Sequence, residues 1–222
     1  MNNITHLFFD LDGTLIDSAP DLALAVNATL RQLDRATVDE TVIRGWVGNG
    51  AKVLIERALS GSSQIDKKLD IALAKQALEL FLANYQQHLC VKSVLYPQVK
   101  ETLQALKDKG LCLALITNKP ERFIQELLEG LGINNYFSLC LGGDSLAHKK
   151  PSPAPLLHAC KKLAVEVENC IMIGDSKNDI LAAKAANMRS VGFSYGYNYD
   201  EDISAYAPDW VLHHFADVLD IP

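Results

Sequence analysis

Two hydrophobic patterns divide the chain. Residues 7–9 form an apolar run, Leu-Phe-Phe, that predicts a short buried strand ending at Asp10. After residue 15 the apolar positions recur at helical spacing, which predicts a helical block without strands up to about residue 84. The helical patterns begin at residues 17–20, where Ser18 and Pro20 are typical of a helix start, and cover residues 51–59 and 69–85. A helical block placed directly after a strand predicts a small domain of its own.

From residue 96 onward, continuous apolar runs alternate with helical patterns. The apolar runs predict strands over residues 111–117, 138–142, 170–174, 190–193 and 210–212. The helical patterns between them run through Leu103, Leu127, Leu156 and Ile180. Apolar strands that alternate with helices are typical of a parallel sheet covered on both faces. The predicted fold class is therefore α/β, with a doubly wound parallel sheet as its core.

Composition limits the classes of partner. A chain of 222 residues, 49% of them hydrophobic, suits one large domain or one domain that carries a smaller one. The 21 basic and 27 acidic residues give a net charge of −6, and no long basic run offsets it, which disfavours a nucleic-acid or anionic-membrane partner. No apolar run reaches the roughly 18 residues that suggest a membrane-spanning helix. The first residues also lack the basic and then apolar pattern of a signal peptide.

The five cysteines point to a reducing compartment. They stand at positions 90, 112, 140, 160 and 170, and no two of them form a C-x-x-C pair. Cys112, Cys140 and Cys170 fall in predicted strands, so we expect reduced, buried thiols rather than a disulfide framework or a zinc site. Together with the lack of a signal peptide, this predicts a cytoplasmic protein.

Polar residues follow the predicted strands where each strand ends. They are Asp10 and Asp12, then Thr117-Asn118-Lys119, then Lys149-Lys150, and finally Asp175 and Asp179. In a parallel sheet the carboxyl ends of the strands share one edge, so these groups would meet there. Asp10 and Asp12 are two apart and point to the same side of an extended chain, where two like charges need a cation. Each group alone has an ordinary interpretation as a turn, a helix cap or a solvated loop. All four together favour a site for Mg²⁺ and a phosphoryl group.

These residues resemble the four ordered motifs of the haloacid dehalogenase superfamily. The motifs are Asp10-Leu-Asp12-Gly-Thr14, Thr117-Asn118, Lys150-Pro151 and Gly174-Asp175-Ser176-Lys-Asn-Asp179. The resemblance implies a Rossmann-like catalytic core over residues 1–15 and 85–222. It also implies that residues 16–84 are a helical cap domain inserted after the first strand. Secondary motifs resemble the phosphoglycolate phosphatase group of this superfamily, among them Trp46-Val-Gly48-Asn-Gly50 and Tyr195-Gly-Tyr-Asn-Tyr199.

The resemblance also implies a role for each motif residue. Asp10 would attack phosphorus as a nucleophile and form an aspartyl-phosphate, and Asp12 would be the general acid and then the general base. Mg²⁺ would be held by Asp10, by the backbone carbonyl of Asp12 and by Asp175. Phosphate would be bound by Thr117, Asn118 and Lys150. Asp179 would orient Lys150 or hold a metal-bound water.

The resemblance implies hydrolysis of a small phosphorylated metabolite, and 2-phosphoglycolate is the leading candidate for the substrate. Within the cap, Asn49 lies in a turn that faces the substrate or simply joins two helices, and Lys52 is a weaker candidate for a substrate carboxylate. A phosphatase for another small metabolite and a sugar-phosphate mutase are alternatives on the same scaffold. A receiver-type signalling domain is a remote alternative, because it lacks a cap and carries its phosphorylated aspartate on a later strand. The oligomeric state, monomer or dimer, stays open.

Overall fold

A six-stranded parallel sheet forms one half of the molecule. The computed structural model describes residues 4–199 and 201–221. The strands run in the order β5-β4-β1-β6-β7-β8, and every neighbouring pair is parallel. Their bounds are β1 (His6–Phe9), β4 (Cys112–Ile116), β5 (Leu139–Leu141), β6 (Cys170–Gly174), β7 (Arg189–Phe193) and β8 (Trp210–Leu212). The predicted parallel α/β sheet is confirmed.

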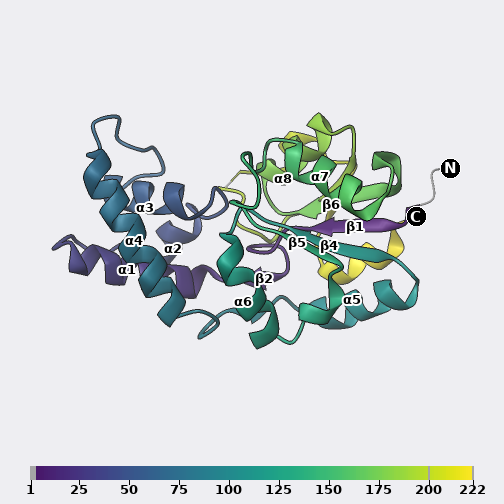
Figure 1. Cartoon of the computed structure of the whole chain (residues 1–222), viewed down its shortest axis with the longest axis horizontal. Helices are drawn as coiled ribbons and strands as arrows, with labels where there is room; N and C mark the ends of the chain where they lie inside the picture. Colours follow the sequence, from purple (N-terminus) through teal and green to yellow (C-terminus); the bar gives the residue numbers. More distant parts are fainter. Residues whose placement is uncertain (1–3, 200, 222) are drawn as a thin grey trace.

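Helices cover both faces of this sheet because the strands bury side chains on both sides. In β1, Leu7 and Phe9 enter one hydrophobic cluster, whereas Phe8 enters another on the opposite face. Helices α7 (Ala154–Leu163) and α8 (Lys177–Ala185) pack on the Phe8 face. The Phe9 face is covered by α5 (Val99–Asp108), α6 (Ile124–Gly130) and the 3₁₀ helix η5 (Phe215–Asp220). Figure 1 shows these two layers above and below β1.

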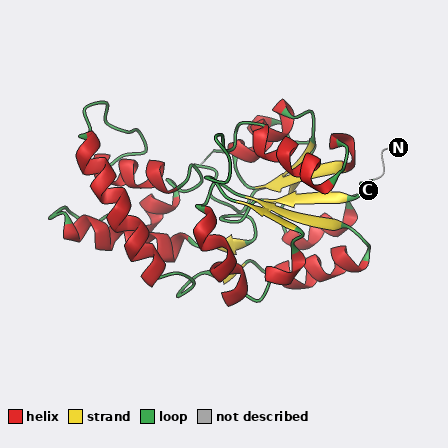
Figure 2. Cartoon of the chain, in the orientation of Figure 1, coloured by secondary structure: helices red, strands yellow, loops and turns green. Residues whose placement is uncertain are grey.

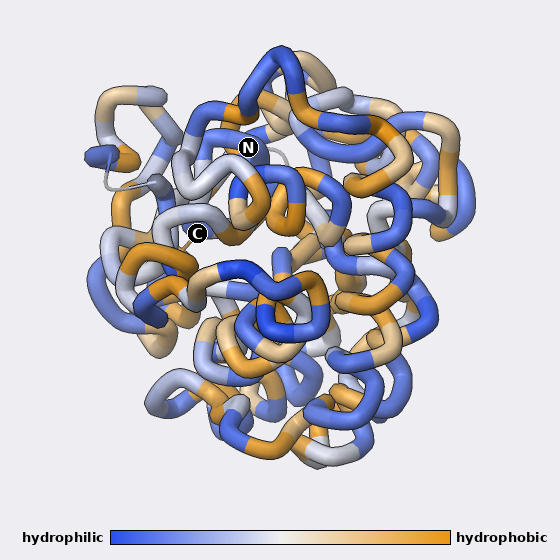
Figure 3. The backbone as a smooth tube through the Cα atoms, turned by 90° about the vertical axis from the view of Figure 1, so that its left-hand side faces the viewer, coloured by the Kyte–Doolittle hydropathy of each residue, from blue (hydrophilic) through white to orange (hydrophobic). Residues whose placement is uncertain are grey.

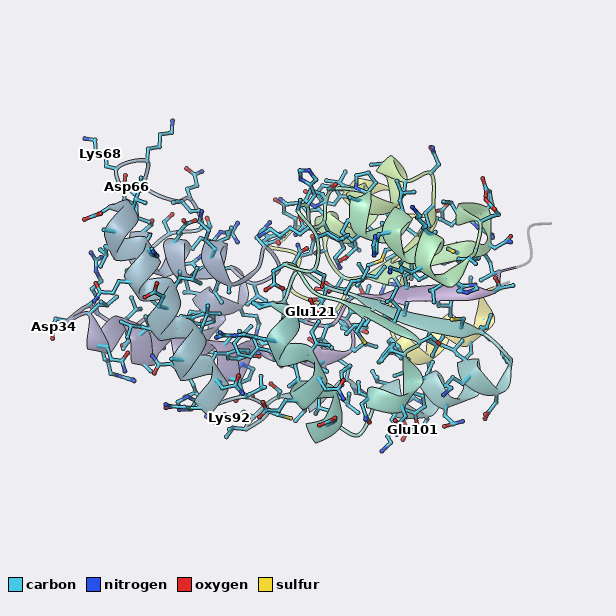
Figure 4. All side chains as sticks on the ribbon, viewed as in Figure 1. Asp34, Asp66, Lys68, Lys92, Glu101 and Glu121 are labelled. Carbon is cyan, nitrogen blue, oxygen red and sulfur yellow. The ribbon has the colours of Figure 1, made fainter. Side chains whose placement is uncertain are left out.

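Four helices make up the other half of the molecule. They are α1 (Ala19–Gln32), α2 (Glu40–Arg44), α3 (Ala51–Ser60) and α4 (Ile71–Gln87). Figure 2 shows this helical half beyond the tips of the strand arrows, so the carboxyl ends of the strands face it. Seen from this end, hydrophilic and hydrophobic segments alternate along the chain (Figure 3), as expected of amphipathic helices. Charged residues such as Asp34, Asp66 and Lys68 project outward from its far end (Figure 4).

A two-stranded antiparallel ribbon joins the two halves. Strand β2 (Ile16–Asp17) pairs with β3 (Val94–Leu95), so the chain leaves the sheet and returns to it through adjacent segments. The buried carboxylate of Asp21 stabilises the same junction. It accepts hydrogen bonds from the backbone N–H groups of Lys92 and Ser93 at 2.8 Å. The prediction that no strand occurs between residues 16 and 84 is therefore wrong at its first two residues. Strands of two residues carry no periodicity, and these two are far apart in the sequence.

The cysteines are reduced, as expected, but less buried than expected. All five are free thiols. Cys170 is buried, whereas Cys112 and Cys140 are only half-buried, and Cys140 lies in β5, an edge strand of the sheet. Within residues 4–199 and 201–221, no helix combines the length and the apolar character that crossing a membrane requires.

Candidate active site

The topology creates a crevice at the carboxyl end of β1. The chain builds β4 and β5 on one side of β1 and then crosses to build β6, β7 and β8 on the other. Such a reversal of direction leaves room for a ligand beyond the strand ends. Asp10 lies at this point, buried, with its backbone N–H donating to the carbonyl of Ile173 on β6 at 2.9 Å.

A buried lysine connects two of the carboxylates. The ammonium Nζ of Lys150 lies 2.6 Å from Oδ1 of Asp179 and 3.0 Å from Oδ1 of Asp10. It also donates to the carbonyl of Ile116 at the end of β4 at 2.5 Å. Burial alone lowers the pKa of Lys150, but Asp10 and Asp179 more than offset it, so the net pKa is raised and the ammonium stays charged. Asp179 accepts bonds from Ser176 through its second oxygen, so it holds Lys150 in place from the start of α8.

Asp175, at the end of β6, completes an acidic cluster. Its carboxylate accepts hydrogen bonds from the Thr14 hydroxyl and from the backbone N–H of Tyr197, both at 2.7 Å. Gly13 allows this approach: its φ is +88°, and a Cβ atom there would lie 2.3 Å from Oδ2 of Asp175. The turn after Asp12 therefore requires glycine both for its backbone angle and for space.

The cluster has the chemistry of a cation site. One carboxylate oxygen from each of Asp10, Asp175 and Asp179 lies within 4.8 Å of the others. Burial raises the pKa of Asp10 to about 6, although Lys150 opposes this, and burial and the neighbouring carboxylates raise the pKa of Asp175 well above its usual range. Oδ1 of Asp10 touches Lys150 but makes no hydrogen bond of ordinary geometry. A divalent cation would satisfy this oxygen and relieve the repulsion, so these residues fit a metal ion.

The side chain of Asp12 points away from this cluster. It accepts a 2.5 Å hydrogen bond from the Ser18 hydroxyl and pairs with the ammonium of Lys119 at 2.9 Å. Ser18 is the N-cap residue of α1, but its hydroxyl makes no capping bond, because it is used on Asp12. The two aspartates therefore have separate environments, which suits two different chemical roles.

Lys119 is a residue of this site to which the sequence motifs gave no role. It is buried, and besides Asp12 its ammonium contacts the hydroxyl of Tyr85 on α4 at 2.7 Å. The sequence signal was its place at the end of β4, directly after Thr117 and Asn118. Its partner Tyr85 belongs to the helical half, and no local pattern indicates that contact.

Thr117 and Asn118 lie in the crevice as well. The Thr117 hydroxyl accepts a bond from the backbone N–H of Lys119 at 3.2 Å. The side-chain amide of Asn118 donates to the carbonyls of Gly48 and Lys150, at 2.9 and 3.0 Å, while its own Oδ1 is buried without a partner. Asn178 also donates to the Gly48 carbonyl, at 3.2 Å, so two amides of the core hold the loop that precedes α3.

The two remaining candidates, Asn49 and Lys52, lie at different depths. The backbone carbonyl of Asn49 accepts a 2.6 Å bond from Lys149, which adds a third link between the helical half and the core. The side chain of Lys52 is 71% exposed and faces Glu56 at 3.8 Å. Lys52 does not line the cavity described next.

A small cavity separates the carboxylates from the helical half. Its volume is about 30 Å³, which is space for about two water molecules. The core contributes Asp10, Asp12, Thr117, Asn118, Lys119, Pro120 and Phe123, and the helical half contributes Leu22, Val47, Gly48, Gly50, Ala51, Leu54, Phe81 and Tyr85. A phosphorylated two-carbon molecule is larger than this volume, so the lining residues would have to move apart to admit one.

The family of this chain follows from comparison with known proteins. The family model of the haloacid dehalogenase-like hydrolases matches residues 4–187, a stretch that contains all four motifs. The chain belongs to this family. The hydrolase is 65% identical, over 96% of its length and 94% of the relative's, to the phosphoglycolate phosphatase of Colwellia psychrerythraea. It is 49% identical, over 96% of both chains, to the phosphoglycolate phosphatase of Haemophilus influenzae strain 86-028NP.

A solved structure has the same architecture as this hydrolase. It is a predicted phosphoglycolate phosphatase from Haemophilus somnus 129pt, with 43% sequence identity and a TM-score of 0.92. The match covers 99% of this hydrolase and 98% of the other chain, so it includes the helical half as well as the sheet. The fold class and the superfamily expected from the four motifs are both confirmed.

Proposed function

We propose that this hydrolase is an Mg²⁺-dependent phosphatase that converts 2-phosphoglycolate to glycolate and inorganic phosphate. The observation that carries the proposal is the closed crevice in which Asp10 lies against Lys150, beside Asp175, in a chain 65% identical to a phosphoglycolate phosphatase. The partner is then a small phosphorylated metabolite. Five free thiols support a cytoplasmic location.

In the first step, an Asp10 oxygen attacks phosphorus and forms an aspartyl-phosphate. The bond from phosphorus to the ester oxygen breaks, and Asp12 gives its proton to that oxygen so that glycolate leaves as an alcohol. In the second step, Asp12 takes a proton from water, the water oxygen bonds to phosphorus, and the bond from Asp10 to phosphorus breaks. Phosphate is released, and both aspartates return to their starting states.

The surrounding groups hold the phosphoryl group and neutralise its charge. Lys150 is anchored by Asp179 and Ile116, so its ammonium can serve Asp10 and a phosphate oxygen without reorganising. The Thr117 hydroxyl and the backbone after β4 would hold further phosphate oxygens. Because the Asn118 amide is bonded to two carbonyls, we assign its contribution to the backbone N–H rather than to the side chain.

Asp10, Asp175 and the backbone carbonyl of Asp12 would hold Mg²⁺, with Asp179 close behind them. When bound, the ion would supply positive charge to the phosphoryl oxygens and to the cluster. Asp179 is already committed to Lys150 and Ser176, which supports an indirect role toward the ion.

The helical half is proposed to act as a cap inserted into the core, with the expected cap of residues 16–84 extended to Gln87 so that the whole of α4, Tyr85 included, belongs to it. The β2–β3 ribbon is the natural hinge, because both connections pass through it. Opening breaks the bonds from Asn118, Asn178 and Lys149 to the Gly48–Asn49 loop, and closing restores them. Closure would exclude bulk water while the phosphoenzyme forms.

The test is a screen of phosphate esters at fixed Mg²⁺ that compares kcat/KM values. The screen contains 2-phosphoglycolate, other small phosphorylated acids and sugar phosphates, with release of inorganic phosphate as the readout. We expect 2-phosphoglycolate to rank first and Asp10→Asn to abolish turnover. A flat profile would contradict the substrate assignment. Isomerised sugar phosphate without phosphate release would instead favour the mutase alternative.

A further inference from the structure

Lys119 occupies a position in the closed cavity that the hydrolysis of a phosphate ester does not itself require. Among the lining residues in the part of the chain that the structure describes, Lys119 alone has a cationic side chain. The cavity walls are mainly apolar and include the side chains of Leu22, Val47, Leu54, Phe81 and Phe123. A buried ammonium in such surroundings needs anionic or hydrogen-bonding partners.

The partners of Lys119 in this structure are Asp12 and Tyr85. Its Nζ lies 2.9 Å from Oδ1 of Asp12, 2.7 Å from the Tyr85 hydroxyl and 4.6 Å from the centre of the Tyr85 ring. The Tyr85 hydroxyl accepts this bond, so its own hydrogen remains available to a ligand. Burial raises the pKa of Tyr85 to about 12, so the phenol keeps that hydrogen at neutral pH.

The covalent structure of a phosphorylated 2-hydroxy acid limits where its carboxylate can bind. One methylene separates the ester oxygen from the carboxylate carbon in 2-phosphoglycolate. The cation that binds the carboxylate must therefore lie next to the acid that protonates the ester oxygen. Lys119 meets this condition because it contacts Asp12 directly.

The other lysines nearby do not meet it. Lys150 is committed to Asp10 and Asp179 on the phosphoryl side of the site. Lys149 is bonded to the Asn49 carbonyl, and Lys52 is exposed outside the cavity. Lys119 is also shielded from water, which strengthens its attraction for an anion.

We propose that Lys119, with the Tyr85 hydroxyl, binds the carboxylate of the substrate and so selects small phosphorylated acids over other phosphate esters. The inference rests on the proposed phosphatase function and deepens it. In the closed complex the substrate carboxylate becomes the anionic partner of Lys119, because Asp12 must carry a proton there to act as the general acid. Because Tyr85 lies on α4 and Lys119 on the core, the carboxylate would bind to both halves at once and favour closure.

The test compares two substrates of the same length, 2-phosphoglycolate and ethyl phosphate, which lacks the carboxylate. Both are assayed with saturating Mg²⁺ in the wild type, Lys119→Met, Tyr85→Phe, Lys52→Met and the control Lys161→Met, a substitution of an exposed lysine on α7. In Lys119→Met we expect kcat/KM for 2-phosphoglycolate to fall about 100-fold, or about 2.7 kcal/mol, while kcat/KM for ethyl phosphate stays within about tenfold. Tyr85→Phe keeps the ring that packs against the core, and we expect a loss of about tenfold confined to 2-phosphoglycolate.

Each contrary outcome has a distinct meaning. Equal losses on both substrates in Lys119→Met and Tyr85→Phe would overturn the inference and leave Lys119 a structural support for Asp12. The inference also fails if Lys52→Met, rather than Lys119→Met, removes the preference for the carboxylate. Failure of the wild type to hydrolyse either ester would refute the proposed function itself. Thermal unfolding of each variant shows whether it is folded. If Lys119→Met does not fold, Tyr85→Phe still decides between the two outcomes.

Discussion

The acidic cluster makes a quantitative prediction about protein stability. Burial is the main cause that raises the pKa of Asp10 from 3.8 to about 6, and Lys150 only partly opposes it. Between these pH values the folded protein keeps a proton on Asp10 that the unfolded chain has released. The free energy of unfolding therefore falls as the pH rises through this window. A pKa difference of about 2 corresponds to about 3 kcal/mol at pH 7 and above.

Asp10→Asn removes this ionisation and leaves Lys150 its bond to Asp179. Without metal, we expect the variant to be more stable than the wild type by about 3 kcal/mol at pH 8 and by close to zero at pH 4. For a chain of this length the gain at pH 8 corresponds to a rise in Tm of about 6–12 °C. The assay is thermal and urea unfolding in excess chelator from pH 4 to pH 8. Circular dichroism monitors the unfolding. The stabilised variant is expected to have no phosphatase activity.

The control is Asp39→Asn. Asp39 is an exposed carboxylate at the N-cap of α2, and its side chain makes no capping hydrogen bond. We expect it to change stability by less than about 0.5 kcal/mol, with no trend between pH 4 and pH 8. Equal stability of wild type and Asp10→Asn at pH 8, or a difference that does not vary with pH, would refute the reasoning.

Three further predictions concern the same crevice. Mg²⁺ at about 100 times its Kd should stabilise the wild type by about 2.7 kcal/mol at pH 8 and should stabilise Asp10→Asn far less. The shift in Tm on adding Mg²⁺ measures both effects. Equal shifts in Tm would place the ion elsewhere. Lys150→Met leaves two buried carboxylates without their cation. We expect the free energy of unfolding, measured in urea, to fall by about 3–5 kcal/mol. An unchanged urea midpoint would contradict the buried ion pairs. Gly13→Ala should abolish activity because its Cβ would meet Asp175, whereas Gly61→Ala, with φ +62° and nothing within 4 Å, should cost about 1 kcal/mol and keep full turnover. Normal kcat in Gly13→Ala would show that the turn can move away from Asp175.

The sheet could be predicted because its signals are local. Each core strand is an apolar run of a few residues, and the alternation of these runs with helices indicates a parallel sheet, whereas the pairing of β1 with β4 and β6 was learned from the structure. The same rules place Asp10, Thr117 and Asp175 at one edge, since each directly follows a strand. The β2–β3 ribbon escaped prediction because its strands are two residues long and pair across the whole helical half.

The environment of each site residue could not be predicted in the same way. Ser18 has the sequence of a helix cap, yet its hydroxyl bonds to Asp12. Lys52 was a weaker candidate for a substrate carboxylate, and in the structure its side chain on α3 is 71% exposed. Capping and periodicity describe a residue relative to its own element, whereas these contacts depend on how α1 and α3 dock on the core.

The sequence by itself determined the six strands of the core sheet, their alternation with helices, the order of the four motifs and the hydrolase family that they resemble. These properties rest on spacing within a few residues and on the common edge that parallel strands share. Only the tertiary structure decided which charges meet. It paired Lys150 with Asp10 and Asp179, turned Asp12 toward Ser18 and Lys119, and brought Tyr85 from the helical half onto the same ammonium. The physical reason is that a buried charge is stabilised by whichever partner packing brings within about 3–4 Å, whatever the distance between them along the chain.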